Sequence, residues 1–117
     1  MLFEDLVCRF YSFIIKIKLL HWKTNSFAVH KSTDQLLISL EPNFDRIMET
    51  YMGLKDEKII EGNKAIKIVE INDGDYLKCL AEFESYLSSI SLSESFNNIR
   101  DDILSDINVA KYLTNLK

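Results

Sequence analysis

Five side chains in the first half of the chain have the chemistry of metal ligands: His21, His30, Asp34, Asp45 and Glu49. Two of them are the only histidines in the sequence, and the other three are carboxylates that follow at regular intervals. Imidazole combined with carboxylate is a donor set that suits iron, manganese or zinc better than calcium. The residue types therefore indicate a transition-metal site.

The spacing of four of these residues places them on one stripe of a helix. With a turn of about 100° per residue and His30 at zero, Asp34 falls near ~40°, Asp45 near ~60° and Glu49 near ~100°. The eleven residues from Asp34 to Asp45 rise roughly 16 Å, which is too far to bind one ion within one chain. Two antiparallel copies related by a two-fold axis near residues 39 and 40 would bring the halves together. The spacing thus predicts a homodimer whose metal sites are shared between its subunits.

These motifs resemble the ferroxidase site of the DNA-protecting mini-ferritins of the Dps type. In that family a His-Trp pair stands late in the first helix, and His-x3-Asp and Asp-x3-Glu follow on the second. The resemblance covers about residues 14–52, and the rest of the chain is similar only as helices. The stretch LLHWKTNSFAVHK also looks similar to small uncharacterised ferritin-like proteins of phages and large DNA viruses. The matching motifs in this chain are His21-Trp22, His30-x3-Asp34 and Asp45-x3-Glu49.

The resemblance implies an iron site with catalytic roles for all five candidate ligands. His21, His30 and Asp34 would come from one subunit, and Asp45 and Glu49 from its dimer mate. Iron is the ion that the family oxidises with peroxide or O2, and manganese and zinc are the other ions that the ligand set suits. The chain departs from the family in a shorter gap between the histidines and in a length of 117 residues. That length leaves no room for an N-terminal tail, an extra short helix or a long C-terminus.

Apolar residues recur at helical spacing in four segments, which predicts helices over about 2–23, 27–52, 75–90 and 94–115. In the second segment Gly53 is the expected stop, and Pro42 is expected to kink the helix without breaking it. Residues 24–26 offer caps between the first two helices. The third helix is expected to bury a set of large apolar side chains: Tyr76, Leu77, Leu80, Phe83, Leu87 and Ile90.

The connections between these segments are short, long and short. The long one, about residues 54–73, contains an alternating stretch at 65–71 that looks extended. A long link lets the second and third helices run parallel, as in ferritin-like folds. We therefore expect one all-α domain over residues 1–117, a ferritin-like four-helix bundle with a long crossover between the second and third helices. No Glu-x-x-His motif is present, which argues against a di-iron centre inside one bundle.

The amino-acid composition limits which binding partners and which cellular compartment we expect for the protein. The net charge is −4 and no Lys/Arg-rich arm is visible, so we expect no nucleic-acid partner. The apolar run at residues 10–20 is short and interrupted by lysines, so we expect no membrane association. Cys8 and Cys79 match no paired zinc spacing and indicate reduced thiols in a cytoplasmic setting, or in a virion if the protein is virus-encoded.

Ordinary structural roles compete with metal binding at each of these positions. His30 and Asp34 could form a surface pair one helical turn apart, and Asp45 and Glu49 could be solvated charges. Two functions follow. One is an intracellular iron-binding, ferroxidase-type relative of the mini-ferritins that works as a homodimer or higher oligomer. The other is a non-enzymatic ferritin-like structural or interaction module whose metal site is vestigial or static.

Overall fold

Four helices account for most of the computed structural model, which describes residues 2–116. They are α1 (Leu2–Lys23), α2 (Phe27–Lys55), α3 (Tyr76–Ser88) and α4 (Glu94–Leu113), with a short 3-10 helix, η1 (Asp73–Asp75), leading into α3. There is no strand within residues 2–116. The all-α class expected from the helical spacing of apolar residues is therefore confirmed.

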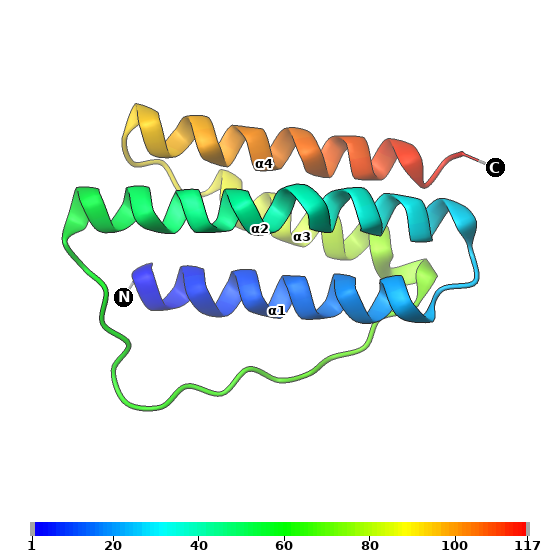
Figure 1. Ribbon diagram of the computed structural model, residues 1–117, viewed down its shortest axis with the longest axis horizontal. Helices are drawn as coiled ribbons and strands as arrows, with labels where there is room; N and C mark the ends of the chain where they lie inside the picture. Colours follow the sequence, from blue (N-terminus) through cyan, green and yellow to red (C-terminus); the bar gives the residue numbers. More distant parts are fainter. Residues whose placement is uncertain (1, 117) are drawn as a thin grey trace.

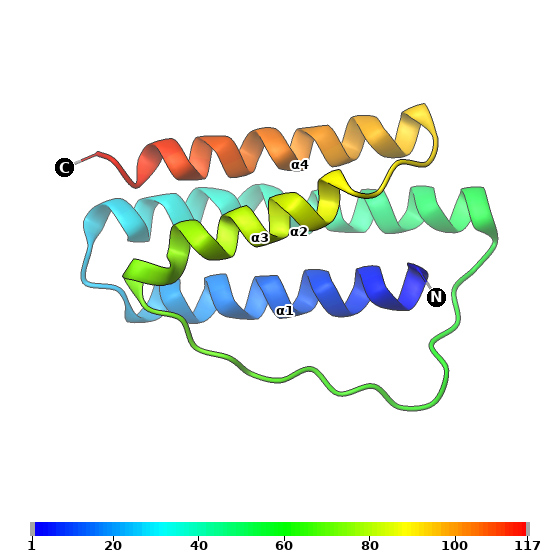
Figure 2. The ribbon, with the colours of Figure 1, turned by 180° about the vertical axis from the view of Figure 1, so that it is seen from behind.

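The chain turns back sharply between α1 and α2 and then crosses the length of the bundle before α3. The connection after α2 runs back to the end at which α2 begins, so α2 and α3 run in the same direction (Figures 1 and 2). Two ion pairs hold this connection against α1, Lys64–Glu4 at 3.0 Å and Lys23–Glu70 at 3.4 Å. The alternating stretch at 65–71 lies in this connection and forms no strand, because no neighbouring strand is there to pair with it.

The first two helices begin and end close to where their sequence signals predict. Ser26 is the N-cap of α2, and its side chain accepts a hydrogen bond from the backbone N–H of Val29 at 3.2 Å. The helix is continuous across Pro42, and α2 is one unbroken ribbon in Figure 1. The expected stop at Gly53 is wrong, because α2 continues to Lys55. The left-handed end position belongs to Asp56, whose N–H donates to the carbonyl of Met52 at 2.8 Å.

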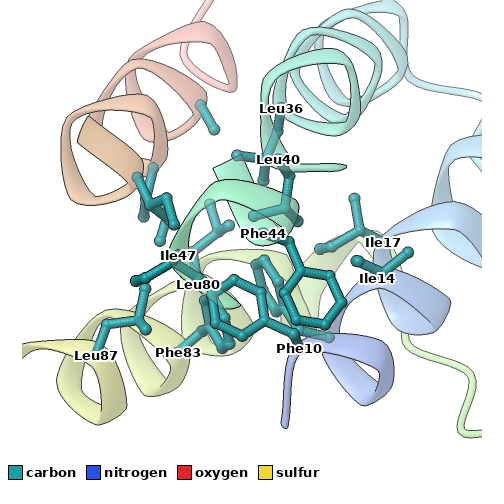
Figure 3. Close-up of a cluster of buried hydrophobic side chains, with 14 of the residues drawn as sticks. Phe10, Ile14, Ile17, Leu36, Leu40, Phe44, Ile47, Leu80, Phe83 and Leu87 are labelled. Atoms are coloured by element: carbon teal, nitrogen blue, oxygen red, sulfur yellow. The ribbon is translucent and has the colours of Figure 1, made fainter. Parts of the chain in front are cut away.

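The core is one apolar cluster with side chains from all four helices. Its centre is aromatic (Figure 3): Phe10 stacks on Phe44 with ring centroids 4.4 Å apart, and Phe83 meets Phe10 edge-on at 5.0 Å. Phe13 stacks on Phe83 with ring centroids 4.0 Å apart. These contacts join α1, α2 and α3, and they fix the α1–α2 pair on which all five candidate ligands lie.

The third helix buries a slightly different face from the one expected. Leu77 was expected to point inward, but its side chain is 51% exposed, and Cys79 is buried instead. Tyr76, Cys79, Leu80 and Phe83 are spaced by three and four residues and so share one helical face, whereas Leu77 lies about 100° away from Tyr76. The helical period therefore decides burial here, and not the apolar character of the side chain.

Candidate metal centre

The two histidines lie against each other where α1 gives way to α2. His21 is in the last turn of α1 and His30 is in the first turns of α2, and the link between the helices is only three residues long. The imidazole rings stack with centroids 4.2 Å apart and an angle of 20° between their planes. The short loop expected from the sequence thus brings the two imidazoles side by side.

Both imidazole rings have a hydrogen-bond partner at Nδ1. His30 Nδ1 lies 3.2 Å from the backbone carbonyl oxygen of His21, which only accepts, so Nδ1 must carry the proton. His21 Nδ1 lies 3.0 Å from Oγ1 of Thr33. When that hydroxyl directs its own hydrogen at the carbonyl of Val29, 2.8 Å away, its oxygen accepts from Nδ1 of His21.

In the Nδ1–H tautomer of an imidazole, the lone pair that can bind a metal is on Nε2. A metal-binding histidine nearly always donates its other ring N–H to a carbonyl, carboxylate or similar acceptor, which fixes the tautomer and the ring orientation. Both His21 and His30 make such a bond. Each histidine therefore makes the hydrogen bond at its second ring nitrogen that metal-binding histidines typically make.

The third candidate on the same side, Asp34, lies one turn after His30 and is half-buried. It lines a surface groove between α1 and α2 together with His21, Lys18 and Glu41. The structure therefore brings His21, His30 and Asp34 to one end of the outer face of the α1–α2 pair. Lys18 also reaches the ring of the neighbouring Trp22, whose side chain is 68% exposed, at 5.8 Å.

The remaining two candidates form a pair of carboxylates further along α2. Asp45 and Glu49 are both exposed and one helical turn apart. A side-chain hydrogen bond that protonated Glu49 donates to Asp45, together with the charge of Asp45, raises the pKa of Glu49 above its ordinary value. Such a shift marks two carboxylates held close enough to repel each other, a condition that a bound cation relieves. Asp45 faces the α1–α2 side, and Glu49 borders a groove between α2 and α4.

The two halves do not meet within one chain. Among residues 2–116 no three His, Cys, Asp or Glu side chains come together as a metal-binding group. Of these four residue types, the buried side chains in that range include only Cys79, which lies on α3. The five candidates therefore stand apart as a stacked His21–His30 pair, with Asp34 one turn after His30, and an Asp45–Glu49 pair further along α2.

Thr33 is the member of the site that sequence reasoning missed. It is fully buried, and its hydroxyl links α2 to the ring of His21. A threonine three residues after a histidine on a helix is common, and only the packing of α1 against α2 gives it this contact. The sequence signal that could have identified Thr33 is its position on the side of α2 that faces α1.

Comparison with known proteins places the chain in a family without assigning it an activity. No curated protein and no solved structure matches it. No helix within residues 2–116 is both long enough and apolar enough to span a membrane. Residues 21–114, which begin at the first candidate ligand and include all five, match the model of a family described as "Family of unknown function (DUF5856)". The match covers most of the chain, which therefore belongs to this family, DUF5856.

Proposed function

We propose that this protein is an intracellular, ferritin-like metal-binding protein related to the Dps-type mini-ferritins, with metal sites shared across a two-fold dimer. The observation that carries the proposal is the stacked histidine pair, in which Nδ1 of each ring has a hydrogen-bond partner, so that each would bind a metal through Nε2. The crossover connection and the parallel course of α2 and α3 are in keeping with a ferritin-like bundle.

The geometry of α2 supports the sharing of sites between subunits. The helix is continuous, so the midpoints of His30/Asp34 and Asp45/Glu49, at positions 32 and 47, lie about 22 Å apart along it. In an antiparallel pair of α2 helices with the axis near residues 39 and 40, each His side faces the partner's Asp/Glu side. Ile38, beside that axis, is 69% exposed, and burying it against its symmetry mate would favour the dimer.

The ligand set fits a divalent transition-metal ion. Two imidazoles and one carboxylate from one subunit, with two carboxylates from the other, match the preference of iron, manganese and zinc for such donors. The repulsion between Asp45 and Glu49 provides a second reason, because two adjacent carboxylates gain from a cation between them. The aromatic core formed by Phe10, Phe44 and Phe83 has no comparable ligands, which favours the outer face of α1 and α2.

The proposed reaction is the oxidation of ferrous iron, which is the substrate. Two ferrous ions each give one electron to a peroxide molecule, which takes up two protons and leaves as two water molecules. His21, His30 and Asp34 would hold iron from one side, and Asp45 and Glu49 would complete the site from the other. The carboxylates also balance the rising positive charge as iron passes from the ferrous to the ferric state.

The experiment that tests this function combines metal content with turnover. Protein purified without chelator should contain iron or zinc by elemental analysis, and added Fe(II) should be oxidised by peroxide faster than in buffer alone. His30→Ala should remove both properties, whereas Lys31→Ala, a neighbouring exposed position, should keep them. Protein that takes up neither metal would instead be the structural or interaction module.

A further inference from the structure

Thr33 is one of only two polar residues buried within residues 2–116, and it faces the histidines. The other, Ser32, is used by the core: its hydroxyl contacts the hydroxyl of Tyr76 at 2.8 Å and donates to the carbonyl of Ala110 at 2.7 Å. Thr33 points the opposite way, toward α1, where its oxygen lies 3.0 Å from Nδ1 of His21. Two adjacent buried hydroxyls thus serve different parts of the molecule.

Thr33 belongs to a closed loop of hydrogen bonds that joins the end of α1 to the start of α2. His21 Nδ1 donates to Thr33, and the Thr33 hydroxyl lies 2.8 Å from the carbonyl of Val29 and 3.0 Å from that of His30. His30 Nδ1 in turn donates to the carbonyl of His21 at 3.2 Å. That carbonyl is among the last four of α1, which have no partner inside their own helix. The ring of His30 is therefore held by the backbone carbonyl of His21, and the ring of His21 is held by Thr33, which lies three residues after His30.

The bond to His21 is not required to satisfy the hydroxyl of Thr33. A threonine inside a helix commonly donates to the carbonyl four residues earlier, and Val29 supplies that acceptor. The contact with His21 uses a lone pair of the oxygen instead. Its effect therefore falls on the imidazole: it selects the Nδ1–H tautomer and fixes the rotation of the ring.

We propose that Thr33 is a positioning residue for metal binding, which holds His21 with Nε2 unprotonated and parallel to the ring of His30. The inference deepens the proposed function and rests on it. With Nδ1 of each ring engaged and the rings stacked with centroids 4.2 Å apart, Nε2 is the nitrogen through which each histidine would bind a divalent ion. A ring without this constraint would spend part of its time in the Nε2–H tautomer, which cannot bind metal through that nitrogen.

The test compares two substitutions at this position with a matched control. Thr33→Val keeps the branched shape and removes the hydroxyl, whereas Thr33→Ser keeps the hydroxyl. Ser32→Ala removes the adjacent buried hydroxyl, which serves the core. The tautomer of His21 is read from long-range 1H–15N NMR spectra of the metal-free protein, and affinity is read from calorimetric titration with Zn2+ alone.

Wild type, Thr33→Ser and Ser32→Ala should all show the Nδ1–H tautomer of His21, and Thr33→Val should show a mixture. Thr33→Val should also bind Zn2+ about 10- to 100-fold more weakly, the usual loss when an outer-shell partner is removed. Wild-type protein with the proton on Nε2 overturns the inference even if Thr33→Val does not fold. So does a folded Thr33→Val protein with unchanged tautomer or unchanged affinity. No zinc binding by wild type, with the tautomer response intact, would overturn the proposed function and leave the control of His21 by Thr33 standing.

Discussion

Phe44 ties the metal-binding face to the core, and its replacement should be among the most costly in the chain. Its side chain is 9% exposed and stacks on Phe10 at 4.4 Å with an angle of 3° between the rings. It also meets Tyr11 edge-on at 5.1 Å. Phe44→Ala removes this packing and leaves a cavity, which costs about 3–5 kcal/mol in free energy of unfolding. That loss is a large part of the 5–15 kcal/mol typical of a whole domain.

The matched control is Phe27→Ala, because Phe27 also lies on α2 but is 81% exposed. Its replacement should change the free energy of unfolding by no more than about 0.5 kcal/mol. Urea unfolding of metal-free protein, followed by circular dichroism, measures both values. A double-mutant cycle of Phe44→Ala with Phe10→Ala should add a coupling of about 0.5–1.5 kcal/mol from the stacked rings. A Phe44→Ala protein as stable as Phe27→Ala would refute the packing of α1 on α2 described above.

Three further predictions concern charge and protonation. Burial raises the pKa of Cys79 to about 11 and that of Tyr76 to about 12. Both groups therefore stay protonated in the folded chain at pH values where they ionise in the unfolded chain. The free energy of unfolding, measured by urea titration, should be at its full value below pH 9 and fall between about pH 9 and 12. Glu49→Gln relieves the repulsion from Asp45, so metal-free protein should unfold at a temperature no lower than wild type, while the rise in melting temperature on adding Zn2+ should disappear. At a net charge of −4, micromolar protein should leave duplex DNA unshifted in a gel at about 150 mM salt; a salt-sensitive shift would mean that the oligomer forms a basic surface.

Most of the fold follows from local signals that the sequence carries in full. The apolar residues of α1 recur at helical spacing, and the buried side chains of this helix, including Leu6, Phe10 and Ile17, follow that spacing. Serine caps mark the starts of α2 and α4. The predicted end of α2 was wrong because a glycine such as Gly53 destabilises a helix by only about 1 kcal/mol, and the packing of the preceding turns outweighs this cost. The left-handed residue then falls at Asp56.

The sequence predicts which residues are candidate ligands and how they are spaced along the helices, but not how they are arranged in space. Spacing alone places His30, Asp34, Asp45 and Glu49 on one side of α2. The contact between the rings of His21 and His30 depends on a three-residue turn that draws the two helices together. The role of Thr33 depends on the same approach, since its hydroxyl reaches across to the other helix. Such contacts between elements have no local signal in the sequence.

Mixed dimers test the sharing of metal sites between subunits most directly. His30→Ala and Glu49→Ala, given different affinity tags, can be co-expressed and the heterodimer isolated. In it, one site combines both substitutions and is lost, whereas the other takes its histidines from the Glu49→Ala chain and its carboxylates from the His30→Ala chain. Native mass spectrometry with Zn2+ should therefore show two occupied sites in the wild-type dimer, one in the heterodimer and strongly reduced binding in each homodimeric variant. A heterodimer with no bound zinc, beside a wild type that binds it, would mean that all ligands act within one chain and would contradict the shared site.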